Sequence, residues 1–453
     1  MKVYTSYTTY SQLWDKSIPS HWDVLPMYAL AKEKSICNCI DLPLLSVYLD
    51  AGVIPFEKRT EKRTNATSKD LSKYQRVDPG DFVLNNQQAW RGSVGISFST
   101  GIVSPAYIVL TLGEGLNSRF ANYLFRSNVM VDQYLINSKS VGSIQRNIYW
   151  PSLKRTIVPV PPRDEQDQIV RFLDWKVSEI NKLINIRKRQ ITELEELKRS
   201  KIGNIVMGQT LNVPQKEPGV SWVKSIPAHW EERSLIQVAE EQQIKNTGMV
   251  EDNLLSLSYG KIINKDINTT DGLLPASFEG YQIINSGNIV LRLTDLQNDH
   301  RSLRTGLATQ RGIITSAYTC LKARDNVLPE YLQLQLHVAD LCKVFYGMGG
   351  GVRQSIGFKD IRRLIVAIPS LDEQKSILSA VSGFEGPINS VIAKYQEIIL
   401  SLEELKTKLV SDVVTGKIDV RDVVIPDYEY VDEEVGTAET DDSEENIEEQ
   451  EEE

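Results

Sequence analysis

The sequence has few cysteines and no long apolar run. Its four cysteines are scattered over 453 residues, and only Cys37 and Cys39 are close together, so they cannot form the disulfide framework of a small secreted protein. No stretch approaches the roughly 18 consecutive apolar residues that a membrane helix requires, and the first residues, MKVYTSYTTY, contain no apolar signal segment. None of the four histidines lies near two cysteines, as a zinc cluster would need. We therefore expect a cytoplasmic chain with reduced thiols, no bound metal and no membrane partner.

Motifs of nucleotide-using and methyl-transferring enzymes are also missing. The Gly-Lys pairs at 260–261 and 416–417 lack both the upstream glycine spacing and the hydroxyl residue of a GxxxxGK[ST] phosphate loop. The glycine-rich stretch GMGGG at 347–351 does not complete a GxGxxG fingerprint, and no NPPY-like tetrad of adenine methyltransferases occurs. We expect no catalytic residue and no cofactor site in this chain.

The charge is unevenly distributed. The net charge is −9, but residues 427–453 contain fifteen Asp or Glu and no Lys or Arg. Without that segment, the 51 basic residues face 45 acidic ones, so the body of the chain is mildly basic. A like-charged segment with few apolar residues cannot bury enough surface to fold, and we predict that 427–453 is disordered. The basic body is compatible with nucleic-acid binding but does not demonstrate it.

The chain is an internal repeat. SIPSHW at 17–22 recurs 208 residues later as SIPAHW at 225–230, and DEQ at 164–166 recurs at the same offset at 372–374. LEELK at 194–198 and the glycine at 208 also recur 208 residues later. Four blocks at one offset indicate two copies of one plan, and such internal symmetry outweighs any single motif.

Each copy has a globular part followed by a long helix. Short β-type runs alternate with Gly/Pro turns and a few helical stretches, which is typical of an α+β unit. Proline followed by an acidic first turn, as in VPVPPRDEQ and VAIPSLDEQ, then predicts a helix start in each copy. Two equal helices in one chain most simply pack against each other as an antiparallel coiled coil, which gives a pseudo-two-fold axis. The predicted division is 1–160 (globular), 161–210 (helix), 211–368 (globular), 369–420 (helix) and 427–453 (acidic segment).

A heptad pattern predicts which residues of the two helices meet. In the second copy the apolar residues alternate at spacings of three and four, and the matched positions of the first copy are more often polar. The predicted seam consists of Ile180, Leu183, Leu194, Leu197, Ile388, Val391, Tyr395, Ile398, Leu402, Leu405 and Leu409. In the first copy, Ile184 and Ile191 widen this seam into a second stripe.

These features together resemble the specificity subunit of a type I DNA restriction–modification system. The resemblance rests on the I-P-x-x-W element that opens each copy, the P-x-x-x-E-Q element that ends its globular part, and the long helix that ends in a glycine. It covers essentially residues 1–420 and does not include the acidic segment. It implies two target-recognition domains that each bind half of a bipartite site in double-stranded DNA. The paired helices would set the spacing and dock two methyltransferase subunits, in a complex with restriction/translocase subunits. S-adenosylmethionine, ATP and Mg²⁺ are then expected on those partners, and this chain would be non-catalytic.

Given this resemblance, we expect DNA-binding residues in three regions of the globular parts. They are chosen by residue type, because phosphates attract Lys and Arg while base edges suit amide and guanidinium groups. In the first copy they are Lys58, Arg59, Lys62, Arg63, Asn85, Gln87, Gln88, Trp90, Arg91 and Arg146. In the second copy they are Arg292, Gln297, Asn298, His300, Arg301, Arg304 and Arg353. The loop after the matched strand differs between the copies, NNQQAWRGS against RLTDLQNDHRSLRTG, whereas the blocks around it repeat. This is expected if each copy binds a different half-site, although ordinary surface loops also diverge.

Two other functions fit parts of the sequence. A single-chain methyltransferase or nuclease with diverged motifs would transfer methyl groups or cut DNA without partners. A coiled-coil scaffold unrelated to DNA would fail to bind a duplex even at low salt.

Overall fold

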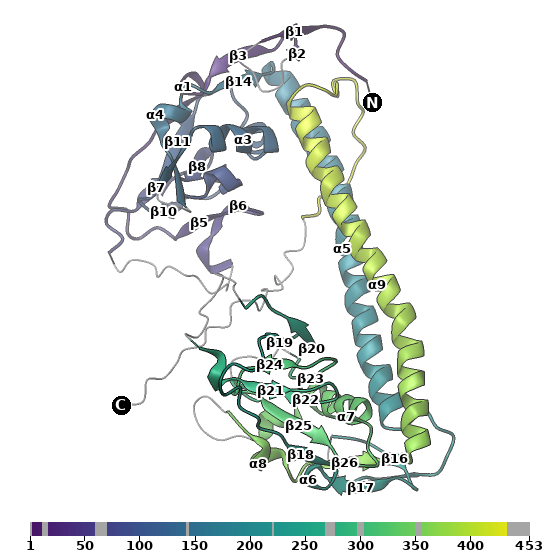
Figure 1. The fold of residues 1–453 in the computed structure, drawn as a ribbon. Helices are drawn as coiled ribbons and strands as arrows, with labels where there is room; N and C mark the ends of the chain where they lie inside the picture. The colour runs from purple at the N-terminus through teal and green to yellow at the C-terminus, as the bar shows by residue number, and fades with distance from the viewer. Residues whose placement is uncertain are drawn as a thin grey trace. The chain divides into compact units, whose positions relative to one another are not determined.

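The computed structural model describes residues 2–10, 17–58, 70–141, 145–219, 222–267, 277–296, 303–348 and 355–432. The predicted α+β class is confirmed, because helices and antiparallel strands are mixed in both copies. The described residues form two compact units, one within residues 2–187 and 396–432 and the other within residues 188–395. We call them unit 1 and unit 2. The boundary falls inside both long helices, α5 (Arg163–Val206) and α9 (Leu371–Val414), which are labelled in Figure 1.

Unit 1 is organised around a four-stranded antiparallel sheet. Its strand order is β4 (Ala31–Glu33), β11 (Tyr107–Leu112), β8 (Asp81–Asn85) and β9 (Val94–Ile96). Strand pairs join β1 (Tyr7–Thr9) to β2 (Ser17–Pro19), β3 (Asp23–Pro26) to β14 (Ile157–Val160), β5 (Leu45–Tyr48) to β6 (Gly52–Pro55), β7 (Gln75–Val77) to β10 (Gly101–Val103), and β12 (Ser138–Val141) to β13 (Gln145–Ile148). The helices are α1 (Met27–Leu30), η1 (Phe56–Lys58), η2 (Ala89–Arg91), α2 (Ser118–Phe125), α3 (Asn128–Ile136) and α4 (Trp150–Leu153).

Unit 2 repeats this topology. Its sheet has the matching order β18 (Ala239–Glu241), β25 (Thr319–Ala323), β22 (Ile289–Leu291) and β23 (Thr305–Leu307). Its strand pairs join β15 (Gln215–Lys216) to β16 (Ile226–Pro227), β17 (Glu231–Ser234) to β26 (Ile365–Ile368), β19 (Leu255–Ser258) to β20 (Lys261–Asn264), and β21 (Gln282–Ile284) to β24 (Gly312–Ile314). The helices are α6 (Leu235–Val238), η3 (Phe278–Gly280), α7 (Pro329–Leu341), η4 (Val344–Gly347) and α8 (Phe358–Ile361).

The central strand of each sheet is buried on both faces. In β8, Phe82 and Leu84 join the main core of unit 1, while Val83 lies between them in sequence and joins a second apolar cluster. Side chains alternate across a strand, so one strand supplies both clusters. In β22, Ile289 and Leu291 face one cluster and Val290 the other. This two-sided burial fixes the end of the strand, from which the divergent loop starts.

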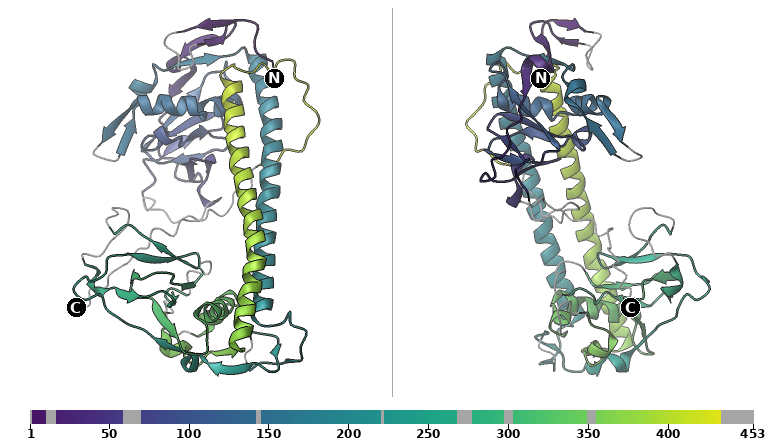
Figure 2. Two further views of the ribbon diagram at one scale, coloured as in Figure 1. Left: turned by 45° about the vertical axis from the view of Figure 1, so that its right-hand side comes forward. Right: turned by 90° about the vertical axis from the view of Figure 1, so that its left-hand side faces the viewer.

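The two long helices run side by side in opposite directions within each unit (Figures 1 and 2). In unit 1, Ile180 and Ile184 of α5 share a core with Leu409 and Val413 of α9. In unit 2, the cluster that holds Ile202 and Val206 of α5 also holds Ile377 and Val381 of α9. The same polar contact occurs in both units: Lys406 Nζ donates to Asn181 Oδ1 at 3.3 Å, and Lys198 Nζ donates to Asn389 Oδ1 at 3.0 Å. Each member of the second pair lies 208 residues from its counterpart in the first.

The predicted seam needs a correction at every second position. Its members Ile180, Leu194, Ile388, Tyr395, Leu402 and Leu409 are buried or partly buried. The exposed members are Leu183, Leu197, Val391, Ile398 and Leu405. The residue one position later is buried or partly buried in each case: Ile184, Lys198, Ile392, Ile399 and Lys406. In a helix with 3.6 residues per turn, steps of three and four both return to nearly the same face. Tertiary packing therefore decides whether the residue at the step of three or at the step of four is buried, and in both copies it is the residue at the step of four.

The acidic segment also needs a correction. Residues 427–432 were predicted to be disordered, but they lie along α5, where Ser178 Oγ donates to the carbonyl of Glu429 at 3.1 Å. Backbone hydrogen bonds do not depend on side-chain charge, so an acidic peptide can dock where polar side chains receive its main chain. Residues 433–453 lie outside the described part of the chain.

Candidate nucleic-acid interface

The repeated motifs meet at one junction in each unit. In unit 1, Glu165 of the DEQ motif accepts hydrogen bonds from Tyr4 Oη at 2.6 Å and Trp22 Nε1 at 3.0 Å, and it pairs with His21 Nε2 at 2.6 Å. Glu165 is 6% exposed. A buried carboxylate needs such partners to offset its desolvation. The junction thus attaches the I-P-x-H-W element to the first turn of α5.

Unit 2 builds the same junction around Glu373. Its Oε1 pairs with His229 Nε2 at 2.7 Å and accepts from Trp230 Nε1 at 3.3 Å. Partial burial alone would raise the pKa of Glu373, but hydrogen bonds from His229, Ser370 and Trp230 hold this pKa at about 2. The carboxylate is therefore a fixed structural anion.

The repeated glycines and glutamines complete the junction. Gly208 and Gly416 have φ values of 66° and 77°, which favour glycine, and a Cβ there would lie within 2.6 Å of Pro227 and 2.4 Å of Pro19, respectively. Gln166 Nε2 donates to the carbonyl of Pro161 at 2.9 Å, and Gln374 Nε2 donates to that of Pro369 at 3.0 Å. These motifs are scaffold, which leaves the divergent loops as the candidate interface.

The loop after β8 presents polar side chains on a hydrogen-bonded turn. Asn85 Oδ1 accepts from the backbone N–H of Gln87 at 3.1 Å, and Trp90 Nε1 donates to the carbonyl of Gln87 at 3.0 Å. The Arg91 guanidinium lies over the Trp90 ring at 4.8 Å. Gln87, Gln88 and Arg91 are exposed, and Trp90 is partly exposed. The amides and the stacked arginine are thus available to bases or phosphates.

A second segment is tied to this loop. The backbone N–H of Ile148, at the end of β13, donates to the carbonyl of Asn86 at 2.9 Å. Arg146 lies on the same short strand, paired with Ser140 across the hairpin, and is partly exposed. The structure therefore brings together two candidate regions that are about 60 residues apart in the sequence. Lys58 ends η1 and is exposed, whereas Arg59, Lys62 and Arg63 lie outside the described residues.

Unit 2 repeats the backbone tie with different side chains. The N–H of Ile356 donates to the carbonyl of Leu293 at 3.0 Å, and both residues occupy the positions that match Ile148 and Asn86. Arg292, which matches Asn85, is partly exposed. The candidates Gln297, Asn298, His300, Arg301 and Arg353 lie outside the described residues.

Arg304 needs a correction. It was predicted to contact DNA, but it is fully buried at 0% exposure. Its guanidinium donates to the carbonyls of Arg292 at 3.1 Å and Thr294 at 2.8 Å, and to Tyr346 Oη at 3.0 Å. A guanidinium has five donors and no acceptor, so it suits a turn rich in carbonyls. Arg304 shapes the loop after β22, and we withdraw it as a contact.

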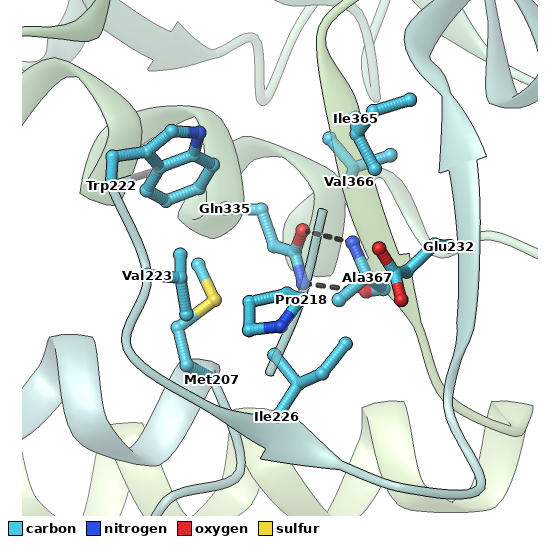
Figure 3. Close-up of a pocket in the computed structure, with 10 residues that line it drawn as sticks. All are labelled: Met207, Pro218, Trp222, Val223, Ile226, Glu232, Gln335, Ile365, Val366 and Ala367. Carbon is cyan, nitrogen blue, oxygen red and sulfur yellow. Dashed lines mark hydrogen bonds between the residues drawn. The ribbon is translucent and has the colours of Figure 1, made fainter. Parts of the chain in front are cut away.

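A small pocket lies within the described part of unit 2. The pocket in Figure 3 lies in unit 2 beside the hydrogen bonds between Gln335 and the backbone of Ala367, and its volume of about 10 Å³ has room for roughly one water molecule. Within the described ranges, no group of three or more His, Cys, Asp or Glu residues could hold a metal ion. In the same ranges, no helix is both long and apolar enough to cross a membrane.

Sequence reasoning missed the residues that hold segment 427–432. Ser178, Asn181 and Asn185 are polar yet almost fully buried, at 2%, 5% and 5% exposure. Their spacing of three and four residues places them on one face of α5. This polar stripe is the sequence feature from which a buried polar contact could have been predicted.

Comparison with known proteins shows which family the chain resembles. Residues 34–196 match the family model of the type I restriction modification DNA specificity domain. A relative from Methanocaldococcus jannaschii, named as the type I restriction enzyme MjaX specificity subunit, is 23% identical over 324 residues, which cover 70% of this chain and 69% of the relative. The resemblance to type I specificity subunits is therefore confirmed.

One solved structure shares the fold. A chain in a structure concerned with complex assembly and conformational transition of the type I R-M system superposes with a TM-score of 0.60 at 14% identity, covering 88% of this chain and 99% of that one. The crystal structure of the HsdS subunit from Thermoanaerobacter tengcongensis has 15% identity, covers 89% of this chain and 99% of that one, and gives a TM-score of 0.42.

Proposed function

We propose that this chain is the DNA-recognition subunit of a type I restriction–modification complex. Residues 1–160 and 211–368 act as target-recognition domains, and each binds one half of a bipartite site in double-stranded DNA. The helices of 161–210 and 369–420 form an antiparallel coiled coil that sets the spacing of the two domains. One observation carries this proposal. The two units share a sheet order and the backbone tie at Asn86 and Leu293, yet present different side chains from that scaffold.

The exposed side chains fit the chemistry of DNA recognition. In unit 1, the amides of Gln87 and Gln88 match the donor and acceptor pattern of adenine, and Arg91 suits guanine or a phosphate. Lys58 and Arg146 supply further positive charge. In unit 2, Arg292 takes the place of Asn85. The other candidates of this copy are Gln297, Asn298, His300, Arg301 and Arg353. Different groups at matched positions favour different half-sites.

The exposed face of the helices supports docking of methyltransferase subunits. The predicted seam residues that the chain leaves exposed recur every seven residues in α9, at Val391, Ile398 and Leu405. Leu183 and Leu197 occupy the equivalent stripe of α5 and are 48% and 47% exposed. A heptad stripe left uncovered by its own chain suits a helix of another subunit.

The catalytic work is assigned to partner subunits. Methylation, translocation and cleavage would use S-adenosylmethionine, ATP and Mg²⁺ bound to two methyltransferase subunits and to restriction/translocase subunits. This chain would supply sequence specificity alone.

Methylation mapping tests the proposal. A genome that carries this chain and its cognate methyltransferase is sequenced for modified bases, first with the natural chain and then with residues 1–155 replaced by the equivalent part of a relative. We expect a bipartite motif of which only one half changes. Changes in both halves would contradict modular recognition, and methylation that persists without this chain would contradict its role as the specificity subunit.

A further inference from the structure

The segment Tyr428–Asp432 is bound by side chains of α5 through its main chain. Ser178 Oγ donates to the carbonyl of Glu429 at 3.1 Å and accepts from the N–H of Val431 at 2.8 Å. Asn181 Nδ2 donates to the carbonyl of Val431 at 3.2 Å, and Asn185 Nδ2 to that of Asp432 at 2.9 Å. Three nearly buried polar side chains therefore follow the backbone of one short extended peptide. We call this segment the strap.

The strap also contacts the globular part of unit 1. The Arg119 guanidinium of α2 lies 5.9 Å from the centre of the Tyr430 ring. Arg119 Nη2 pairs with Asp174 Oδ1 of α5 at 3.2 Å, and Tyr123 Oη donates to the same oxygen at 2.9 Å. The strap thus touches a cluster that joins α2 to α5.

Copy 2 lacks this set of residues. Its hydrogen bond from the N–H of Leu328 to Gln374 matches that from the N–H of Asn117 to Gln166, and this alignment places Glu330 and Leu334 where copy 1 has Arg119 and Tyr123. At the 208-residue offset, the positions of Asp174, Ser178 and Asn185 are occupied by Ser382, Gly386 and Ala393. Only Asn181 has an identical counterpart, Asn389, which bonds to Lys198. Five of the six strap-site residues are thus specific to the copy that holds the strap.

We propose that α2 and α5 of unit 1 form a peptide-binding groove whose ligand is the chain's own segment Tyr428–Asp432, and that its occupancy holds α2 against α5. The groove selects an extended main chain through Ser178, Asn181 and Asn185, and a tyrosine through Arg119. This proposal does not depend on DNA binding, so its test is separate from the test of the proposed function.

Amide hydrogen exchange on the full-length chain tests the groove. In Ser178→Ala, the Val431 N–H loses its acceptor, and we expect it to exchange about tenfold faster. Asn185→Ala should increase the exchange of the strap in the same direction. Asn389→Ala removes the copy 2 counterpart of Asn181 and should leave strap exchange unchanged. A Val431 N–H that exchanges in the unaltered chain as fast as an unprotected amide would overturn the groove.

A substitution in the strap itself tests its effect on α2. Val431→Pro removes the N–H that donates to Ser178 and keeps an extended backbone, and the fold around α5 should survive because the change is confined to the strap. We expect faster exchange across Ser118–Phe125 and unchanged exchange across Pro329–Leu341 of unit 2. Unchanged exchange in Ser118–Phe125 would show that the strap binds without holding α2, which would overturn the second half of the proposal.

Discussion

Arg292 and Arg304 flank the divergent loop of unit 2, and their surroundings give them different roles. The first is partly exposed at the end of β22, while the second is buried and its guanidinium caps backbone carbonyls of the loop. Composition could not separate them, because both are arginines beside a strand end. The structure distinguishes them through a distant contact: the backbone N–H of Arg304 donates to Asp340 Oδ2 of α7, 36 residues later in the chain, at 2.7 Å.

A paired substitution separates the two roles. Arg304→Met keeps much of the side-chain volume but removes the donors to buried carbonyls, so we expect the free energy of unfolding to fall by about 2–4 kcal/mol. Arg292→Met should change it by no more than about 0.5 kcal/mol and should weaken DNA binding. Urea unfolding measures the first effect and fluorescence anisotropy with a duplex the second. Equal stability of the two variants would contradict the structural role of Arg304.

The Glu373 junction gives a pH dependence with a defined sign. The pKa of about 2 in the folded chain lies below the ordinary value near 4.3, so the ionised group stabilises the fold above about pH 4.5, and this contribution is lost as the pH falls toward 2. We expect Glu373→Gln to cost about 1 kcal/mol at pH 7, a modest figure because the side chain is 31% exposed. The difference from the natural chain should shrink between pH 4.5 and 2 in thermal melts. Asp372→Asn, on the 97% exposed neighbour, is the control and should show no such trend.

At the scale of elements, the helices were predictable and their contact register was not. Proline and acidic residues mark the helix starts in the sequence, and α5 and α9 begin at Arg163 and Leu371. The heptad pattern contains two overlapping stripes, at steps of three and of four. In α9 one stripe is Val391, Ile398 and Leu405 and the other is Ile392, Ile399 and Lys406, so both are largely apolar. Sequence periodicity alone cannot tell which stripe faces its own chain and which is left for a partner. The position of the globular part decides this, and it is a long-range property.

Neighbouring residues of α5 test this register. Ile184 is fully buried and Leu183 is 48% exposed, although both are aliphatic residues of one helix turn. Ile184→Ala should reduce the free energy of unfolding by about 2–4 kcal/mol, because it leaves a cavity in the core shared with α9. Leu183→Ala should cost less than about 1 kcal/mol and should weaken methyltransferase docking instead. The opposite order of stabilities in urea unfolding would restore the seam predicted from the sequence.

At the scale of the whole molecule, the repeat was the strongest signal. The offset of 208 residues predicted two equivalent units, and the two sheets have the same strand order. The binding of the strap could not be predicted from composition. Composition indicates only whether a segment's side chains favour water, whereas the strap is held through its backbone by residues about 250 positions earlier in the chain. The loops after β8 and β22 were predicted only in part. The repeat predicted their position in each copy, but it did not predict how their side chains pack.

The proposed role of the helices as a spacer leads to a prediction about the DNA gap. Lys198 and Asn389 are hydrogen-bonded, so four helix-forming residues inserted after each would lengthen both helices at facing positions. Four residues are close to one turn, which adds about 6 Å and nearly preserves the contact face. B-DNA advances about 3.4 Å per base pair. We therefore expect both half-site sequences to persist and the gap between them to grow by one or two base pairs, at reduced affinity because each added pair also rotates the second half-site.

The control is the same insertion after Val424, which is 87% exposed and outside any helix, and it should leave the gap unchanged. Methylation mapping measures the outcome. A gap that stays constant in the helix variant would mean that the helices do not set the spacing, and an altered half-site would mean that they take part in recognising bases.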